Sequence, residues 1–252
     1  MGNPTPDASP QAAPRRTQRG NRTAMTRQAG SPYARLQLYR NPFGELTRGE
    51  RADLAIVDIE ECLEWLHDTR AALQIIGPCG HGKTTHLLAI ERRMIERGML
   101  QPWMAESAYV YCPEDGQQPT LPSARPLLVD EAQRLGWRRR GKLLRGGGPL
   151  VVSTHVDLSR KLVRAGFRLR TLDLAEPIDA PRLQSLLNRR IAASALNVEL
   201  VDTATAESHY LQLAEVVALQ RQFGSNIRLI EHHLYEVFQR FAEKGEPWRP
   251  VS

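Results

Sequence analysis

The stretch GPCGHGKTT, residues 77–85, is the strongest indication of the fold in this sequence. It follows a short apolar run, ALQII at 72–76, and overlaps the start of a helical pattern, TTHLLAIERRMIER at 84–97. A short apolar run that ends at Gly and Pro is typical of a buried strand. Glycines adopt backbone angles closed to other residues, so successive N–H groups can turn inward around an anion. The sequence therefore predicts a strand, an anion-binding loop and a helix in succession.

The loop has the spacing of the phosphate-binding P-loop: Gly77, four residues, then Gly82, Lys83 and Thr84. We expect Lys83 to contact the β and γ phosphates of ATP and the Thr84 hydroxyl to bind Mg²⁺, with the positive end of the following helix dipole close by. The predicted nucleotide-binding residues are Gly77, Pro78, Cys79, Gly80, His81, Gly82, Lys83, Thr84 and Thr85. The alternative interpretations are a glycine-rich turn that binds nothing and a redox role for Cys79.

A second motif indicates that the nucleotide is hydrolysed. In PLLVDEAQRL, residues 126–135, an apolar strand ends in Asp130 and Glu131. In this position the first carboxylate can hold Mg²⁺ and the second can orient or activate the attacking water. Two acids at an ordinary helix N-terminus are the alternative interpretation. We therefore predict Asp130 and Thr84 as metal ligands, and Glu131 and Lys83 as catalytic residues.

Short apolar runs separated by helical or irregular segments indicate a mostly parallel sheet with covered faces. The runs are ALQII (72–76), AYVYC (108–112), PLLVD (126–130), PLVVST (149–154) and RTLDL (170–174). The connection at 113–125 contains three prolines, which exclude a regular helix there and lead us to expect one face of the sheet to be open for a partner. Before the sheet, residues 51–69 have apolar side chains at spacings of three and four, which predicts one amphipathic helix.

The pattern changes after about Ala180, where no further strand-like run appears. Three amphipathic helical patterns follow, at 180–196, 206–224 and 226–245. The fold class is therefore predicted as α/β, a P-loop NTPase three-layer sandwich followed by a small helical lid domain. The predicted domains are a basic tail at 1–37, an α/β nucleotide-binding core at 38–178 and a helical lid at 179–252.

The net positive charge lies at the N-terminus. The formal net charge is +6, and residues 1–40 contain seven arginines and one acid, Asp7, so residues 41–252 are neutral overall. The tail has almost no apolar side chains before about residue 33, and we expect it to be disordered. Such a tail can bind nucleic acid or an acidic partner, and the alternative is a solvated segment without a function.

Composition excludes several classes of protein. No apolar run approaches the roughly 20 residues of a membrane span, and the N-terminus lacks the apolar stretch of a signal peptide. The cysteines Cys62, Cys79 and Cys112 have neither a CxxC nor a His partner pattern, so neither a disulfide framework nor a zinc site is indicated. We expect a cytoplasmic protein.

With these motifs the chain resembles the AAA+ ATPases over roughly residues 38–245, and in particular the helper ATPases of bacterial transposition and general secretion. The segment NPFGEL at 41–46 is similar to one that lies against the adenine in those helpers. The resemblance therefore implies that Asn41, Pro42 and Phe43 contact the base.

Two further roles follow from the same resemblance. PLVVSTH is similar to the strand that ends in the polar residue called sensor 1, which implies that Thr154, or its neighbour His155, contacts the γ-phosphate or the lytic water. GSNIRLI at 224–230 is similar to the sensor 2 segment of the lid, which implies that Arg228 reaches the nucleotide across the cleft between domains.

The resemblance also implies a homo-oligomer in which an arginine finger from one subunit completes the site of its neighbour. Arg168 or Arg170 stands at about the expected place for this finger. The alternative is that both arginines flank an edge of the sheet.

The leading hypothesis is an ATP-driven switch that binds MgATP between core and lid, hydrolyses it, and passes the nucleotide state to a protein partner or to DNA. The candidate DNA contacts are the tail and the cluster at 138–145, with a solvated helix face as the alternative for the cluster. The second hypothesis is a nucleotide-dependent scaffold or signalling module with little turnover. A small-molecule kinase is disfavoured by the Asp130–Glu131 pair and the helical C-terminal domain.

Overall fold

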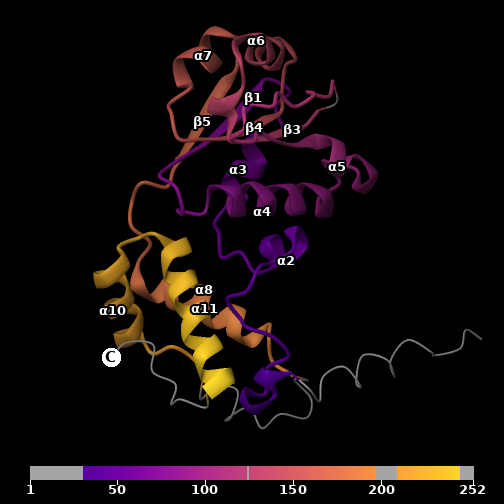
Figure 1. Cartoon of the computed structure of the whole chain (residues 1–252). Helices are drawn as coiled ribbons and strands as arrows, with labels where there is room; N and C mark the ends of the chain where they lie inside the picture. The colour runs from indigo at the N-terminus through magenta and orange to yellow at the C-terminus, as the bar shows by residue number, and fades with distance from the viewer. Residues whose placement is uncertain (1–30, 124, 197–208, 245–252) are drawn as a thin grey trace, which may run out of the picture.

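The computed structural model describes residues 31–123, 125–196 and 209–244. It contains an α/β unit with a five-stranded, all-parallel sheet, which confirms the predicted fold class at the level of an α/β sandwich (Figure 1). In spatial order the strands are β2 (Tyr109–Tyr111), β3 (Leu127–Asp130), β4 (Leu150–Thr154), β1 (Ala71–Ile76) and β5 (Arg168–Asp173). Each strand overlaps one of the apolar runs of the sequence.

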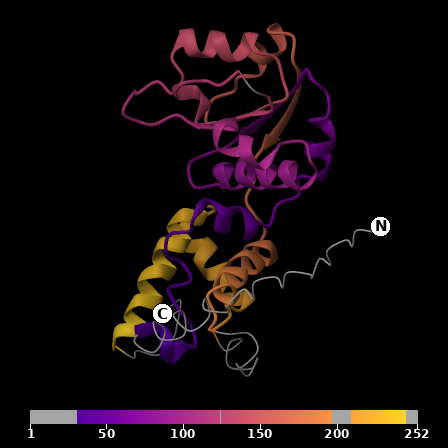
Figure 2. The same ribbon diagram turned by 90° about the vertical axis from the view of Figure 1, so that its right-hand side faces the viewer.

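Helices cover both faces of the sheet (Figures 1 and 2). On one face lie α3 (Glu60–Trp65), α4 (Lys83–Glu96) and α5 (Ala105–Ala108). On the other face lie α6 (Trp137–Arg145) and α7 (Ser159–Arg164). The α/β unit therefore has the three layers of a sandwich.

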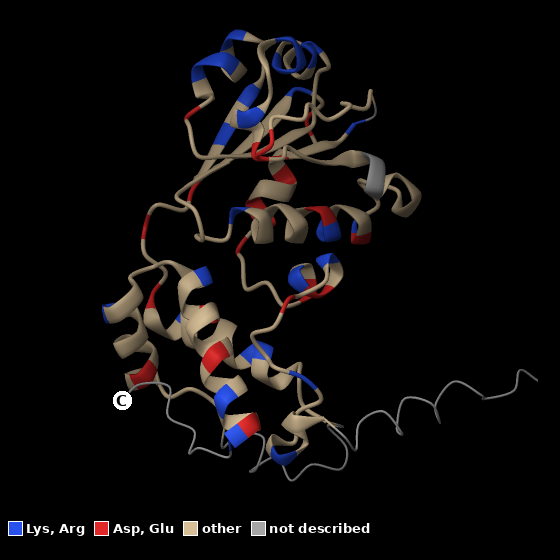
Figure 3. Ribbon diagram, in the orientation of Figure 1, with Lys and Arg blue, Asp and Glu red and all other residues tan. Residues whose placement is uncertain are grey.

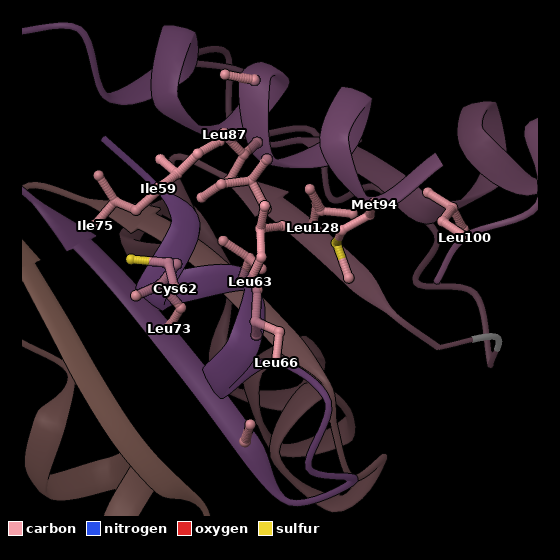
Figure 4. Close-up of a cluster of buried hydrophobic side chains, with 14 of the residues drawn as sticks. Ile59, Cys62, Leu63, Leu66, Leu73, Ile75, Leu87, Met94, Leu100 and Leu128 are labelled. Carbon is pink, nitrogen blue, oxygen red and sulfur yellow. The ribbon is translucent and has the colours of Figure 1, made fainter. Parts of the chain in front are cut away.

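The side chains of β1 alternate between the two helical layers. Leu73 and Ile75 pack with Leu63 of α3 and Leu87 of α4 (Figure 4), whereas Ala72 packs in the cluster on the opposite face. All five side chains are fully buried. A parallel strand that is covered on both faces has apolar residues in succession rather than in alternation, which explains the run ALQII.

The connection at 113–125 was expected to contain no helix and to leave one face of the sheet open, and only the first expectation is confirmed. No helix forms in its described residues, as its prolines predict. The expectation that one face of the sheet is open is wrong, because α6 and α7 cover that face. Leu143 of α6, Leu162 of α7 and Leu121 of the connection are buried there in one cluster.

The single helix predicted at 51–69 is also wrong. Two short helices, α2 (Arg48–Asp53) and α3, are separated by the non-helical residues 54–59. Three residues of this segment are β-branched and therefore weak helix formers. The guanidinium of Arg182 donates to the carbonyl oxygen of Ile56 at 3.2 Å. A contact from another part of the chain thus takes the place of a helical hydrogen bond.

The C-terminal part of the described chain is helical. Its helices are α8 (Ala180–Ala192), α10 (Leu213–Phe223) and α11 (Ile227–Lys244), each within one of the three helical patterns of the sequence. Their apolar faces meet in one buried cluster that includes Leu187, Leu219 and Leu234. We call this unit the helical domain.

The arm that precedes α2 packs with the helical domain. The buried cluster of that domain also contains four residues of the arm: Tyr33, Leu36, Leu38 and Phe43. The ring centroid of Phe43 lies 5.4 Å from that of Phe238 on α11. Residues 38–43, assigned to the α/β core from the sequence, therefore lie with the helical domain instead.

Residues 1–30, 197–208 and 245–252 lie outside the described residues, and with them most of the predicted basic tail and the end of the predicted lid. Of the helices in the described ranges, none combines the length and the apolar character that a membrane crossing requires.

Candidate functional site

The predicted motifs meet at the carboxyl ends of the strands. Because β4 lies between β1 and β3, the residues after β4 lie between the loop that follows β1 and the acids that end β3. The chain leaves β1 through α4 on one face of the sheet and leaves β4 through α7 on the other (Figure 1). In open parallel sheets, ligands bind outside the carboxyl ends of strands whose connections diverge in this way.

The loop after β1 has the backbone that its glycines predict. Gly80 and Gly82 have φ angles of +81° and +84°, in the left-handed region that favours glycine. No side chain caps the N-terminus of α4 at Gly82. A Cβ at Gly80 would collide with the side chain of Asn226, and one at Gly77 would lie 3.0 Å from Leu174 Cβ. The loop is thus closely packed at Gly77 and Gly80, and the uncapped amides at the start of α4 are the groups that can bind an anion.

Lys83 lies inside this loop with only 5% of its surface exposed. Its ammonium donates to the carbonyl oxygens of Gly77 and Pro78, both at 3.0 Å, and lies 3.2 Å from Nε2 of His155. Burial lowers the pKa of Lys83, and the nearby carboxylate of Glu131 acts in the opposite direction. The cation is thus held between the loop and the acids at the end of β3.

Asp130 is buried and surrounded by hydroxyl groups. Its Oδ2 accepts hydrogen bonds from Thr84 Oγ1 at 2.9 Å and from Tyr109 Oη at 3.0 Å, while Oδ1 accepts from Ser153 Oγ. Burial raises the pKa of the Tyr109 phenol, so this hydroxyl stays protonated and acts as a donor. The Thr84 hydroxyl and the Asp130 carboxylate are therefore adjacent, as the predicted metal pair requires.

Glu131 has a left-handed backbone, with φ 60° and ψ 44°, which is uncommon for a residue other than glycine. Its amide donates to Ser153 Oγ at 3.1 Å. Its Oε2 accepts from Gln133 Nε2 at 2.6 Å, and lies 3.3 Å from His155 Nε2 and 3.5 Å from Arg134 Nη2. This turn brings the carboxylate beside the end of β4 and within reach of the loop.

The two candidates at the end of β4 make different contacts. Thr154 is fully buried, and its hydroxyl donates to the Val156 carbonyl at 2.8 Å and accepts from the Val156 amide at 3.1 Å. The His155 ring lies between Lys83 and Glu131. His155, rather than Thr154, therefore touches both the loop and the acids.

The start of α11 brings the helical domain to the loop. Nη1 of Arg228 lies 3.7 Å from Sγ of Cys79. The side chain of Asn226 lies against Gly80 and also accepts a hydrogen bond from the Leu229 amide at 3.2 Å. The residue that touches the loop is therefore also a cap of α11, and Arg228 faces the loop from the helical domain.

A cavity of about 590 Å³ lies between the α/β unit and the helical domain. One wall, the loop wall, consists of residues 79–85 and Glu131. Another, the apolar wall, consists of residues 54–57, Ile178 and Leu186. Arg228 also lines the cavity. Charged side chains of both signs also line the cavity, among them Asp58, Asp179, Arg182 and Glu231. The volume is within the range of small-molecule sites.

The segment Asn41–Phe43 does not line this cavity. Nδ2 of Asn41 donates to the Tyr235 carbonyl at 2.9 Å, and the Pro42 carbonyl accepts from Nε of Arg190 at 3.0 Å. Phe43 is buried in the core of the helical domain. The adenine contacts that the resemblance implied for Asn41, Pro42 and Phe43 are therefore replaced by packing within that domain. Residues 54–57 line the cavity instead.

Arg168 and Arg170 lie on β5, at an edge of the sheet. Arg168 forms an ion pair with Asp68, and Arg170 forms one with Glu61, in the same chain. Neither arginine lines the cavity. An arginine finger at either position would have to exchange this ion pair for a contact with a second subunit.

The loop wall, together with Asp130, which is buried behind it and does not line the cavity, offers the groups that a magnesium triphosphate needs. Mg²⁺ prefers oxygen ligands and is usually held by one or two carboxylates together with phosphate oxygens, and Asp130 with the Thr84 hydroxyl offers such a set. Lys83 and Arg228 supply positive charge on two sides of the loop. The left-handed backbone at Gly80 and Gly82 has the glycine conformation of an anion-binding loop, and the side chain of Asn226 lies against Gly80.

Four side chains of the site were missed in the sequence: Tyr109, Ser153, Gln133 and Arg182. Tyr109 and Ser153 lie beside Asp130 because β2 and β4 are the neighbours of β3. That strand order is a signal that could have identified them. Gln133 follows the acids by two residues, so its proximity to Glu131 was also accessible. Arg182 is one of several arginines on α8, and its sequence context carries no signal.

No protein-family model matches the chain, and no curated protein matches it. The motifs and the geometry of the cavity therefore carry the functional conclusion.

Proposed function

We propose that the chain binds MgATP in the cavity between the α/β unit and the helical domain, hydrolyses it, and transmits the nucleotide state to a partner. The observation that carries the proposal is the convergence of Lys83, Thr84, Asp130 and Glu131 on one glycine loop. These residue types are the ones that phosphoryl transfer requires: a cation, a metal-binding pair and a group that orients water.

The chain's own residues account for each step of hydrolysis. The loop amides and Lys83 would bind the phosphates, and the Thr84–Asp130 pair would hold Mg²⁺, which when bound would supply neutralising charge to the phosphates. Glu131 orients a water and accepts its proton. The water oxygen bonds to the γ-phosphorus as the bond to the β–γ bridging oxygen breaks, giving ADP and phosphate, and the proton passes from Glu131 to phosphate.

His155 and Arg228 would make the site sensitive to the γ-phosphate. His155 lies between Lys83 and Glu131. A γ-phosphate would attract Lys83 away from His155 and so change the contacts of the His155 ring. Arg228 approaches the loop from the helical domain. Attraction between Arg228 and the γ-phosphate would bring the two domains together in ATP but not in ADP, which is a mechanism for a switch.

The experiment that tests the proposal measures phosphate release by the purified chain with MgATP. We expect the wild type to release phosphate, and Glu131→Gln to bind ATP normally while its turnover falls by roughly 10²- to 10⁴-fold, the usual effect of losing a general base. Glu64→Gln is the matched control, because Glu64 is an exposed acid on α3 outside the cavity. A wild type that neither binds ATP nor releases phosphate would overturn the proposal.

The second candidate function is a nucleotide-dependent scaffold or signalling module with little turnover. One observation favours it: Glu131 is already engaged by Gln133 at 2.6 Å and lies 3.3 Å from His155, contacts that must loosen before it can orient water. Wild-type protein that binds MgATP tightly but releases no phosphate, with DNA present or absent, would support this candidate.

A further inference from the structure

The outer surface of α6 and α7 is strongly basic. The α6 sequence WRRRGKLLR contains five cationic side chains and the α7 sequence SRKLVR contains three, and neither helix contains an acid. Figure 3 shows this charge at the end of the molecule remote from the helical domain. Both helices pack on the same face of the sheet through Leu143 and Leu162, so their cations share one surface.

Six of these cations define what we call the basic face: Arg138, Arg139, Arg145, Arg160, Lys161 and Arg164. Within the described residues, none of the six forms an ion pair. The acid that lies nearest in sequence, Asp157, accepts hydrogen bonds from Gln74 and from the Ser159 amide at the start of α7. Hydrogen bonds from Ser159 and Gln74, and to a smaller extent the charge of Arg160, lower the pKa of Asp157. The other five cations of the basic face have no acidic partner within the described residues.

Arginines elsewhere on the α/β unit behave differently. Arg92 and Arg93 on α4 pair with Glu96, and Arg97 pairs with Glu60. An ordinary solvated surface mixes charges in this way. A surface with one sign of charge is instead typical of a site that attracts a polyanion.

The cations of the basic face are arranged along the two helices. On α6, Arg138 and Arg145 are seven residues apart, which places them on one side of the helix, while Leu143 faces the sheet. On α7, Arg160 and Arg164 are four residues apart and share a side in the same way. These four arginines thus point away from the core that Leu143 and Leu162 occupy, whereas Arg139, four residues before Leu143, is half-buried at the edge of the face.

We propose that the basic face binds duplex DNA through its phosphate backbone. Five of its six cations are arginines, whose planar guanidinium binds phosphate through two parallel hydrogen bonds. Binding of this kind releases counterions and requires no base contact. This inference concerns a surface separate from the cavity and does not depend on nucleotide binding.

Other polyanions fit the face less well. A membrane-bound helix buries a row of apolar side chains in the lipid. Leu143 and Leu144 of α6 pack with the sheet core, which leaves Trp137 and Val163 as the large exposed apolar side chains of the two helices. Single-stranded nucleic acid is held by several stacked aromatic side chains, and the one aromatic residue in α6 and α7 is Trp137, which is 78% exposed and lies beside Arg138. The two phosphate backbones of a rigid DNA duplex match a face of arginines better than a membrane or a single strand does.

The test compares two variants of the full chain that lose equal charge. The first carries Gln in place of Arg138, Arg145, Arg160 and Arg164. The control carries Gln in place of four exposed arginines elsewhere: Arg92, Arg93, Arg221 and Arg240. Binding to a labelled duplex of mixed sequence is measured by fluorescence anisotropy over a salt series without nucleotide, and thermal unfolding verifies that both variants are folded.

We expect the basic-face variant to bind at least about tenfold more weakly than the control, with the slope of log K against log salt reduced by roughly three to four, about one for each lost phosphate contact. Since both variants keep the N-terminal tail, any binding by the tail is common to both. Equal affinity of the two variants would overturn the proposal. So would a basic-face variant that keeps duplex binding but loses binding to vesicles of phosphatidylserine and phosphatidylcholine, which would identify a membrane site.

Discussion

The two walls of the interdomain cavity are built in different ways. The loop wall comes from one continuous stretch, residues 79–85, with Glu131 nearby. Its glycines, Lys83, Thr84 and Glu131 have proposed roles that few other residue types can fill. The apolar wall combines residues 54–57 with Ile178 and Leu186, which are far apart in the chain and need only suitable size and hydrophobicity. We therefore expect substitutions in the loop wall to remove function and those in the apolar wall to reduce it by degrees.

The largest effect is expected at Lys83. Its replacement by Ala removes the buried cation that faces the phosphate site, and charge-assisted hydrogen bonds to phosphate contribute about 1.5–3 kcal/mol each, so MgATP affinity should fall by about 100-fold. A fluorescent ATP analogue measures the change. Lys161→Ala, at an exposed lysine on α7, serves as the control and should bind normally. Equal affinity in the two variants would show that the loop wall does not hold the phosphates.

Gly80→Ala tests the contact between the loop wall and the helical domain. Gly98→Ala is the matched control, because both glycines have positive φ, at +81° and +69°, but only a Cβ at Gly80 meets another residue, Asn226. Each variant should lose about 1–2 kcal/mol of stability from the left-handed backbone. Only Gly80→Ala should also weaken ATP binding, by roughly tenfold, since it displaces a cap of α11. Thermal unfolding and ATP titration measure both quantities.

Arg228→Ala removes the cation that the helical domain presents to the loop wall. We expect affinity for ATP to fall by roughly tenfold, the effect of one charge-assisted hydrogen bond, and affinity for ADP to fall less, because the γ-phosphate is the proposed contact. Arg221→Ala, at an exposed arginine of α10, should change neither. Equal losses for ATP and ADP would contradict a role in sensing the γ-phosphate.

The smallest effect is expected in the apolar wall. Ile56→Ala removes three carbon atoms from a half-buried side chain that lines the cavity, so affinity for ATP should fall only about three- to tenfold. Leu213→Ala, at an exposed leucine of α10, is the control. A loss as large as that of Lys83→Ala would show that the two walls do not differ as we describe.

The difference between the two walls also explains which parts of the fold and of the site could be predicted from the sequence. Local spacing and the alternation of buried and polar segments predict the strands and α4. They also predict the group of Lys83, Thr84, Asp130 and Glu131, which the structure brings together. The break in the helix predicted at 51–69 has a local cause, the β-branched residues of the segment, and a distant one, the hydrogen bond from Arg182 to the carbonyl of Ile56. Local periodicity carries no information about such a contact.

The arm at Asn41–Phe43 illustrates a different limit. Its short motif is similar to an adenine-contacting segment, yet Phe43 packs on Phe238 and Asn41 binds the Tyr235 carbonyl. A short motif specifies residue types but not the surface on which they pack, which depends on the apolar face of α11. The choice between Thr154 and His155 has a local reason instead, because the Thr154 hydroxyl is hydrogen-bonded to the backbone of Val156 two residues later.

The most direct test of the central claim is a calorimetric titration of the full chain with ATP, with and without Mg²⁺. The proposed site predicts saturable binding of one nucleotide per chain, tighter with Mg²⁺ than without it because the Thr84–Asp130 pair needs the metal to engage the phosphates. Absence of any binding heat in the presence of Mg²⁺, or binding with the same affinity when the metal is removed, would contradict it.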